Sequence, residues 1–142
     1  MLAKQEISGI IIAGSGKFGR FLAHKMSRAA EAVVIIDIDA GALAQLPSDC
    51  PITAVEGDAS NIEVLRYAGI ARSRAVIATT DQDSINLMIA SIASEIYDVP
   101  EVVAIVSDSN RIPDREQCHF KIICPMLTVA DTVLDSIQPQ GR

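Results

Sequence analysis

The chain has 142 residues, which is enough for one domain with a substantial core and too few for two domains of ordinary size. Hydrophobic residues make up 49% and charged residues 21%, a composition that argues against disorder. The formal net charge of −6, the absence of tryptophan and the lack of a basic cluster argue against a nucleic-acid partner, because phosphate backbones attract basic surfaces and exposed bases stack on aromatic rings.

Six short apolar runs alternate with helical patterns along the chain. The runs predict strands over residues 7–13, 32–37, 52–56, 74–79, 101–106 and 121–124. Most are continuously apolar, which is typical of parallel strands that are covered on both faces. We therefore predict one α/β domain over residues 1–142, a doubly wound Rossmann-type sheet of six parallel strands in the order 3-2-1-4-5-6.

Helices are predicted from apolar spacing and from capping residues. In the first crossover, apolar residues recur at spacings of three or four: Phe18, Leu22, Met26 and Ala29 or Ala30. A longer helix has the apolar face Ile85, Met88, Ile89, Ile92 and Ile96. Ser60 followed by Glu63 has the form of a capping box, and Gly69 offers a stop, so a short helix is predicted between them.

The last predicted helix, residues 127–138, has a wide apolar face. At about 100° per residue its apolar side chains fill an arc of roughly 160°, whereas a surface helix needs about 100°. These residues are Met126, Leu127, Val129, Ala130, Val133, Leu134 and Ile137. Two interpretations stay open: the helix is packed deeply in its own domain, or one side packs on its domain and the other on a partner chain.

The sequence predicts a cytoplasmic protein that does not insert into the membrane. Its apolar runs are far shorter than the roughly 20 residues of a membrane helix, and residues 1–6 lack the features of a signal peptide. The 3 cysteines have no CxxC spacing, which favours reduced thiols. Because His24 and His119 add too few ligands, we expect no metal site.

Residues 14–19, Gly-Ser-Gly-Lys-Phe-Gly, follow the first strand and open the first helix. Gly14 permits a tight turn, Gly16 lets the backbone approach a pyrophosphate, and Gly19 lets the helix pack closely. Lys17 is within reach of the phosphates; the alternative is a solvated lysine at a helix start, where a cation is mildly unfavourable. In this context the turn predicts a dinucleotide or nucleotide site.

Asp37 ends the second strand, 18 residues after Gly19, where a carboxylate can accept both ribose hydroxyls of an adenosine. Its charge repels a 2′-phosphate, so we expect NAD(H) or an adenine nucleotide (ATP, ADP or AMP) in preference to NADP(H). Ile38 and Asp39 follow it as further candidate contacts. For Asp39 an N-cap of the next helix is the simpler interpretation.

Polar residues also follow the third and fourth strands. Asp58 could accept a hydrogen bond from the adenine amine while the backbone at Ala59 reads the ring edge; equally, Asp58 could only stabilise a turn. Residues 79–80, two threonines, end the fourth strand across the switch point, where phosphates or a second nucleoside lie. Asp81 or Asp83 is expected to cap the next helix.

The potential catalytic groups of the sequence form no known catalytic arrangement. Tyr67 and Tyr97 have no lysine four residues later, His24 falls within a helix, and His119 is expected in a solvated loop. The motifs of serine hydrolases, zinc proteases and P-loop enzymes are absent. After the sixth strand there is one helix and no substrate domain. We therefore predict a protein that binds a nucleotide and is not an enzyme.

Several segments together resemble the TrkA N-terminal domain, also called the RCK or KTN domain, of potassium channels and transporters. Besides the glycine turn and residues 34–39, the specific motifs are Gly57-Asp58-Ala59-Ser60, Leu65–Ile70 with the pattern L-x-x-A-G-I, Ala78–Asp83 with Asn86, and Ile122-Ile123-Cys124-Pro125. The match runs in order along nearly the whole chain.

The resemblance implies a cytosolic regulatory domain that binds NAD(H) or ATP/ADP-type ligands and controls potassium transport by ligand-dependent conformational change. It also implies a homodimer or higher RCK-type assembly in which the last helix crosses to the partner subunit, and a membrane transporter or channel as partner. With the contacts above, the candidate site comprises Gly14, Ser15, Gly16, Lys17, Phe18, Gly19, Asp37, Ile38, Asp39, Asp58, Ala59, Thr79 and Thr80.

Two departures from the family pattern stand out. Residues 118–120, Cys-His-Phe, replace a Gly-Ala pair found in many relatives, and the smaller C-terminal lobe that often follows is missing from the 142 residues. Two alternatives to a regulatory role in potassium transport stay open. One is a fragment of an NAD-dependent oxidoreductase, and the other is a regulatory or dimerisation domain that is fused to another soluble enzyme.

Overall fold

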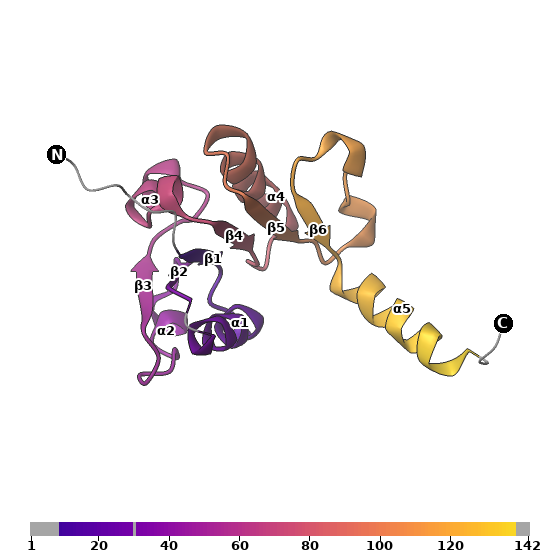
Figure 1. Ribbon diagram of the computed structural model, residues 1–142, viewed down its shortest axis with the longest axis horizontal. Helices are drawn as coiled ribbons and strands as arrows, with labels where there is room; N and C mark the ends of the chain where they lie inside the picture. Colours follow the sequence, from indigo (N-terminus) through magenta and orange to yellow (C-terminus); the bar gives the residue numbers. More distant parts are fainter. Residues whose placement is uncertain (1–8, 30, 139–142) are drawn as a thin grey trace.

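The computed structural model describes residues 9–29 and 31–138, in which a six-stranded parallel sheet carries helices on both faces (Figure 1). The strands are β1 (Ile10–Ala13), β2 (Val33–Asp37), β3 (Ile52–Glu56), β4 (Ala75–Ala78), β5 (Glu101–Ile105) and β6 (Lys121–Ile123). Their order is β3-β2-β1-β4-β5-β6, as predicted. The first strand begins at Ile10 rather than at residue 7; residues 7 and 8 lie outside the described part of the chain.

Helices α1 (Lys17–Arg28) and α2 (Ala40–Leu43) lie on one face of the sheet. The other face carries α3 (Ile62–Tyr67), the 3₁₀ turn η1 (Ile70–Arg72), α4 (Asp83–Ser91) and the π-helical turn η2 (Ile92–Ile96). Two 3₁₀ turns, η3 (Ser109–Arg111) and η4 (Arg115–Gln117), connect β5 to β6, and α5 (Pro125–Ile137) follows β6. The segment between β5 and β6 therefore contains short turns in place of a long crossover helix.

The core lies on both sides of the central strands. Successive residues of β1 point to opposite faces, so that Ile11 belongs to the cluster under α3 and α4 and Ile12 to the cluster under α1 and α2. All residues of β1 and β4 are buried. Each buried isoleucine side chain contributes about 1.5–3 kcal/mol of hydrophobic stabilisation, which explains why these strands are continuously apolar.

The predicted inner face of the fourth helix is partly wrong. The buried residues of α4 are Asn86, Ile89 and Ala90, whereas Met88 is 48% exposed. Ile96, also assigned to that face, is 59% exposed. The prediction gave weight to large apolar side chains, but besides Ile89 the buried face contains the polar Asn86 and the small Ala90. The π-helical turn then shifts the hydrogen-bond register, so that residue 96 does not continue the buried stripe.

The short third helix has a different cap from the predicted one. The side chain of Asn61, not Ser60, accepts a hydrogen bond from the backbone N–H of Glu63 at 2.9 Å. The helix stops as predicted, since Gly69 has a φ of +94°, a conformation that favours glycine. The amide of Gly69 donates to the carbonyl of Arg66 at 3.0 Å.

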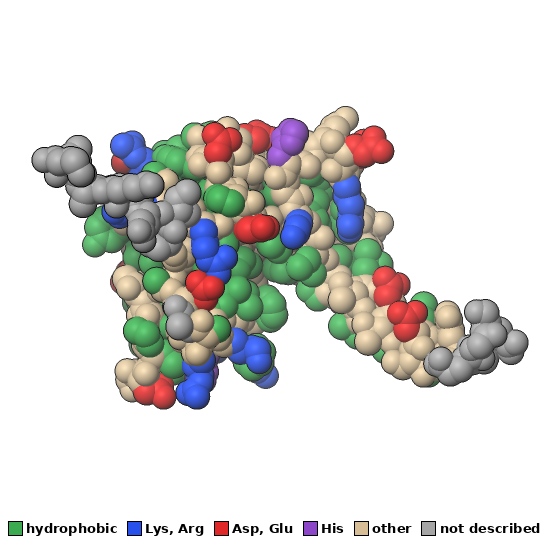
Figure 2. All heavy atoms as spheres, in the orientation of Figure 1, with side chains coloured by type: hydrophobic (Ala, Val, Ile, Leu, Met, Phe, Trp, Pro, Cys, Tyr) green, Lys and Arg blue, Asp and Glu red, His purple; other side chains and the backbone are tan. Residues whose placement is uncertain are grey.

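Helix α5 projects from the edge of the sheet at β6, and Figure 2 shows it separated from the rest of the molecule by open space. All of its residues are exposed, including Met126 (70%), Val129 (61%) and Ile137 (72%). Deep packing within its own domain is therefore wrong for the described chain, and neither side of α5 is buried on it. Pro125 begins the helix two residues earlier than predicted, because proline suits the first helical turn.

None of the helices in residues 9–29 and 31–138 combines the length and the apolar character that crossing a bilayer requires.

Candidate functional site

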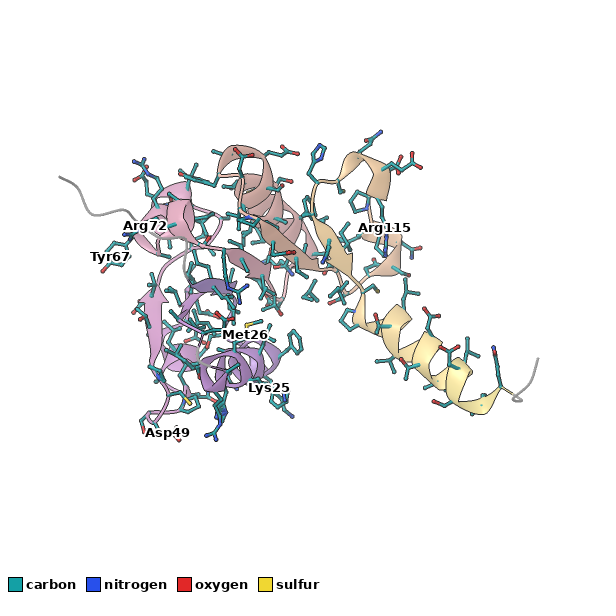
Figure 3. All side chains as sticks on the ribbon, in the orientation of Figure 1. Lys25, Met26, Asp49, Tyr67, Arg72 and Arg115 are labelled. Carbon is teal, nitrogen blue, oxygen red and sulfur yellow. The ribbon has the colours of Figure 1, made fainter. Side chains whose placement is uncertain are left out.

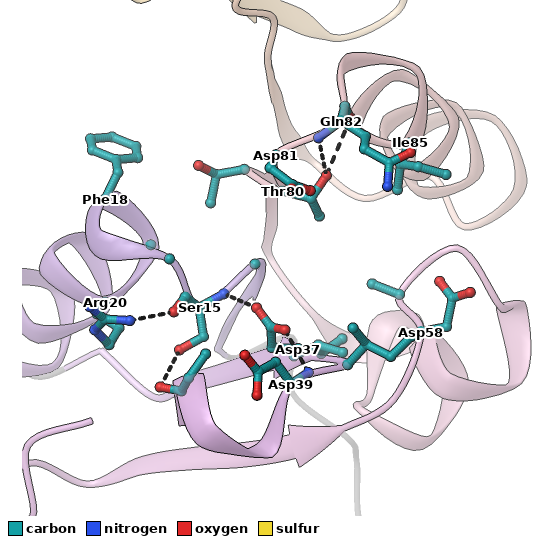
Figure 4. A pocket seen from close by; sticks show the side chains of 18 of the residues that line it. Ser15, Phe18, Arg20, Asp37, Asp39, Asp58, Thr80, Asp81, Gln82 and Ile85 are labelled. Atoms are coloured by element: carbon teal, nitrogen blue, oxygen red, sulfur yellow. Dashed lines mark hydrogen bonds between the residues drawn. The ribbon is translucent and has the colours of Figure 1, made fainter. Parts of the chain in front are cut away.

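A cavity of about 640 Å³ lies where the sheet order reverses between β1 and β4, beyond the carboxyl ends of these strands (Figure 4). Ligands of open α/β sheets bind at this switch point. All of the candidate residues named from the sequence line the cavity. It is also lined by residues that were not among the candidate site residues: Arg20, Ile36, Ala42, Gly57, Asp81, Gln82 and Ile85.

The glycine turn is shaped by close backbone contacts. Gly14 has a φ of +113°, and a Cβ there would lie 2.5 Å from the carbonyl oxygen of Thr79. A Cβ on Gly19 would lie 2.0 Å from the carbonyl oxygen of Gly14. At Gly16, by contrast, a Cβ would meet nothing within 4 Å. The first and third glycines are thus required by the fold, whereas the second leaves backbone open to the cavity.

The amino end of α1 has no protein side chain as its cap. Gly16 occupies the N-cap position, and no acidic residue lies in the first turn. The unpaired amides at such an end and the helix dipole favour an anion. Lys17 lines the cavity at the same point and belongs to none of the ion pairs found among the described residues.

Arg20 was missed because it lies outside the glycine motif itself. Its guanidinium Nη1 donates to the backbone carbonyl of Ser15 at 2.7 Å, which ties α1 to the glycine turn. The spacing held a signal: Arg20 is one helical turn after Gly16, and its amide donates to the Gly16 carbonyl at 2.9 Å. Arg20 and Lys17 together place two cationic groups beside the turn.

The carboxylate of Asp37 connects the turn to the end of β2. Its Oδ2 accepts from the Ser15 amide at 2.7 Å, and its Oδ1 accepts from the Asp39 amide at 2.8 Å (Figure 4). A carboxylate can accept about four hydrogen bonds, so capacity remains on both oxygens. Asp39 is the N-cap of α2, as expected, because its Oδ1 accepts from the Gly41 amide at 2.8 Å.

Asp58 forms the turn after β3. Its Oδ1 accepts from the hydroxyl of Ser60 at 2.6 Å and from the Ser60 amide at 2.9 Å. The hydroxyl, followed by the amide, lowers the pKa of the Asp58 carboxyl below its ordinary value. The turn interpretation is therefore observed, and contact with an adenine stays a prediction. These bonds also explain why Ser60 does not cap α3.

The wall across the switch point consists of the residues after β4. The Thr79 amide donates to the Ala13 carbonyl at 2.8 Å, and Thr80 hydrogen-bonds with Asn86. The expected capping of α4 by Asp81 or Asp83 is wrong, since Gln82 is the N-cap and has no side-chain cap bond. Asp83 instead accepts backbone amides of the loop after β5, because that loop has unpaired donors nearby.

The lining of the cavity combines charged and polar residues with a few exposed apolar side chains. Phe18 (52% exposed) and Ile38 (71% exposed) border it. No histidine, cysteine or tyrosine is present among the described residues that line it. His24 lies within α1, and His119 is exposed in the loop before β6. The cavity lining thus consists of backbone, carboxylate, hydroxyl, cationic and apolar groups.

Known proteins with similar sequences include members of the TrkA group. The sequence profile of the TrkA-N domain matches residues 10–123. The "Trk system potassium uptake protein TrkA" of Streptomyces coelicolor is 28% identical over 132 residues, which cover 93% of this chain and 59% of that protein. The chain thus spans little more than half of that relative.

Solved structures share the fold at low sequence identity. The TrkA-N domain of the inner membrane protein ybaL from Escherichia coli has a TM-score of 0.80 and 18% identity, and the match covers 95% of this chain and all of that one (100%). The GsuK channel bound to NAD has a TM-score of 0.74 and 17% identity, with 94% of this chain and 24% of the channel covered. GsuK bound to ADP has a TM-score of 0.72 and 24% identity, with 95% and 35% covered.

The profile match extends over all six strands, including the glycine turn and the switch point. The chain therefore belongs to the TrkA-N domain family.

Proposed function

We propose that this chain is a regulatory domain that binds NAD(H) or an adenine nucleotide (ATP, ADP or AMP), catalyses no reaction, and controls potassium transport by a ligand-dependent change of conformation. One observation carries the proposal. The cavity at the switch point has carboxylates at the ends of β2 and β3 and cationic groups beside the start of α1. A nucleotide matches this polarity, because it has hydrogen-bond donors on its ribose and base at one end and phosphates at the other.

The ligand contacts follow from this polarity. Asp37, held by the Ser15 and Asp39 amides, accepts the ribose hydroxyls, while the glycine turn and Lys17 face the phosphates. Ile38 borders the base, and Asp58 with the backbone of Ala59 reads its edge. Thr79 and Thr80 contact the ligand from across the switch point. Lys17 discriminates between ligands that differ in their phosphate chains.

Relatives support the assignment of ligand and partner. A relative named for Trk potassium uptake shares sequence with this chain, and a channel solved with NAD and with ADP shares its fold. By analogy, the partner of this chain is a membrane potassium transporter or channel subunit, on whose cytoplasmic side it acts. We further propose that residues 1–142 form one unit, and that α5 crosses to a second copy in a homodimer or higher RCK-type assembly.

Regulation requires that the ligand distinguish two states. A nucleotide that binds one dimer geometry more tightly than another shifts their ratio tenfold for each ~1.4 kcal/mol of difference. A ligand with equal affinity for both geometries shifts nothing, however tightly it binds.

Calorimetry with NADH, NADPH, ADP and ATP tests the proposal. We expect NADH or an adenine nucleotide to bind, and NADPH to bind at least about tenfold more weakly than NADH because Asp37 repels the 2′-phosphate. Asp37→Ala should weaken binding of the preferred ligand by about tenfold or more. The matched control is Asp49→Ala, because Asp49 is an exposed acid in the loop after α2, away from the cavity (Figure 3).

The absence of binding heat with every adenine nucleotide would rule the proposal out. Steady oxidation of NADH with a small carbonyl compound would instead favour an oxidoreductase. A loss of affinity of equal size in Asp49→Ala would mean that the effect of Asp37→Ala is not local to the cavity.

A further inference from the structure

Asn86 is a buried polar residue on α4 whose hydrogen-bonding groups are all used. Asn86 is only 1% exposed to solvent. The amide oxygen accepts from the Thr80 amide at 2.8 Å and from the Thr80 hydroxyl at 2.6 Å. The amide nitrogen donates to the Thr80 carbonyl at 3.1 Å and to the Ile105 carbonyl at 2.8 Å. One side chain therefore holds the ends of two neighbouring strands.

Thr80 is part of the cavity wall, so Asn86 acts on the pocket without lining it. The wall also touches the glycine turn, because Gly14 approaches the Thr79 carbonyl so closely that no Cβ would fit between them. Three hydrogen bonds between the buried side-chain amide of Asn86 and Thr80 thus fix the position of the residues after β4 relative to the glycine turn.

Asp83, three residues earlier on α4, holds the loop after β5. Its Oδ1 accepts from the Ser107 amide at 2.8 Å, and its Oδ2 accepts from the Asp108 amide at 2.9 Å. That loop adjoins the base of α5. The Val106 amide donates to the Ile123 carbonyl at 3.0 Å, and the sulfur of Cys124, the buried N-cap residue of α5, lies 3.8 Å from the Ser107 carbonyl oxygen.

The sheet itself does not join these two loops. The paired residues of β4 and β5 end at Ala78 and Ala104, so residues 79–82 and 106–108 lie beyond the ladder between these strands. Backbone donors in such loops need other partners. The side chains of Asp83 and Asn86 supply them, and we call this pair the α4 clasp.

We infer that the α4 clasp positions the Thr79–Thr80 wall of the cavity and the loop at the base of α5 as one unit. Asp83 and Asn86 are then positioning residues. Through them, a nucleotide bound in the cavity changes the position of α5 relative to the sheet. The response to a ligand rests on the nucleotide binding proposed above, whereas the positioning of the loop by Asp83 does not.

Hydrogen exchange measured by mass spectrometry on the full chain tests the clasp. Asp83→Ala is the main variant, because Asp83 does not line the cavity and is not fully buried. Glu95→Ala, an exposed acid in the π-helical turn after α4, is the matched control. Without nucleotide, we expect the Ser107 and Asp108 amides to exchange about tenfold faster in Asp83→Ala and at the wild-type rate in Glu95→Ala.

With saturating ADP or NADH, the wild type should gain protection both at residues 79–82 and at residues 105–128. Asp83→Ala should keep the protection at 79–82, with a nucleotide Kd within about twofold of wild type, and lose it at 105–128. Asp83→Asn, which retains one acceptor oxygen, should restore part of it. A structural defect alone would not separate the two regions in this way.

The outcomes separate the two proposals. Wild-type protection confined to residues 79–82, or equal protection at 105–128 in wild type and Asp83→Ala, overturns the clasp and leaves nucleotide binding standing. If no nucleotide binds to the wild type, the proposed function and the ligand response both fail. Unchanged exchange of the Ser107 and Asp108 amides in ligand-free Asp83→Ala overturns the positioning role by itself.

Discussion

Individual residues of the cavity are arranged by charge. Asp37 ends β2, and Asp39 and Asp58 follow β2 and β3. Lys17 and Arg20 lie in the first turn of α1. The carboxylate of Asp37 is already held by two backbone amides, so little side-chain freedom remains to be lost when a ligand binds. This preorganisation depends on the exact path of the turn, which is where the glycines act.

We expect Gly14→Ala to destabilise the fold more than Gly16→Ala does. At position 14 the φ of +113° and the Thr79 carbonyl leave no room for a Cβ, so the free energy of unfolding should fall by about 2–4 kcal/mol. At position 16 a Cβ meets no atom within 4 Å, so the loss should be about 1 kcal/mol or less. Urea unfolding measures both.

If residue 16 faces bound phosphates, Gly16→Ala should nonetheless weaken nucleotide binding, because its Cβ enters the open part of the cavity. Equal destabilisation by the two substitutions would contradict the different surroundings of these glycines.

The Asp58 carboxylate should show a pH dependence that is set by Ser60. Its hydrogen bonds with Ser60 lower the folded-state pKa below the unfolded value of about 3.9. The ionised group therefore stabilises the fold above that unfolded value, and the contribution is lost as the pH falls through the lowered folded pKa. Ser60→Ala should raise the pKa of Asp58 toward its ordinary value and shrink this acid-side loss.

Nuclear magnetic resonance titration of the Asp58 carboxyl carbon measures the pKa directly. Ser48→Ala serves as the control, since Ser48 is exposed in the loop before β3. An Asp58 pKa that stays the same in Ser60→Ala would show that the hydroxyl is not the main cause of the shift.

At the scale of elements, α5 is a helix whose apolar side chains are not covered by the described residues of the domain. Its apolar side chains stay in contact with solvent, and this exposed surface is typical of an association site. Within the domain, no buried residue comes from α5. Changes on its apolar face should therefore affect association more than folding of the sheet.

We expect Val133→Asp to convert a dimer into a monomer, because it places a charge on the apolar face that would be buried between two chains. Light scattering after size exclusion measures the mass, and circular dichroism checks that the helices remain. Thr128→Asp is the control, since Thr128 lies on the opposite side of the helix. Loss of the dimer in both variants, or in neither, would contradict association through this face.

At the scale of the whole molecule, nucleotide binding and association should be linked. If the ligand favours one dimer geometry, the factor by which nucleotide changes the dimer dissociation constant must equal the factor by which association changes nucleotide affinity. We expect about tenfold, or ~1.4 kcal/mol, for a regulatory effect. Analytical ultracentrifugation with and without ADP or NADH gives the first factor, and calorimetry on wild type and the monomeric Val133→Asp gives the second.

Identical nucleotide affinity in dimer and monomer, together with a dimer constant that does not respond to nucleotide, would mean that the two processes are independent. The cavity would then bind a ligand without influencing assembly.

Much of the fold and of the candidate site could be predicted from the sequence because the signals are local. Continuous apolar runs identified buried parallel strands, and the six runs agree with the strands within one residue at each end except at the start of β1. The glycine turn and Asp37 lie at positions that the βαβ geometry brings together, so the candidate residues surround one cavity. Their contact with a nucleotide stays a prediction.

What the sequence alone determined is therefore the sheet, its order and the residues that line the cavity of the candidate site, since periodicity and glycine spacing act through neighbouring residues. Only the tertiary structure decided the roles of Asp83 and Asn86 and the exposure of α5. Both partners of Asp83, and the Ile105 carbonyl that Asn86 holds, are backbone groups 19–25 residues away, and backbone groups leave no mark in residue identity. An apolar helix likewise has the same pattern whether its own sheet or a second chain covers it.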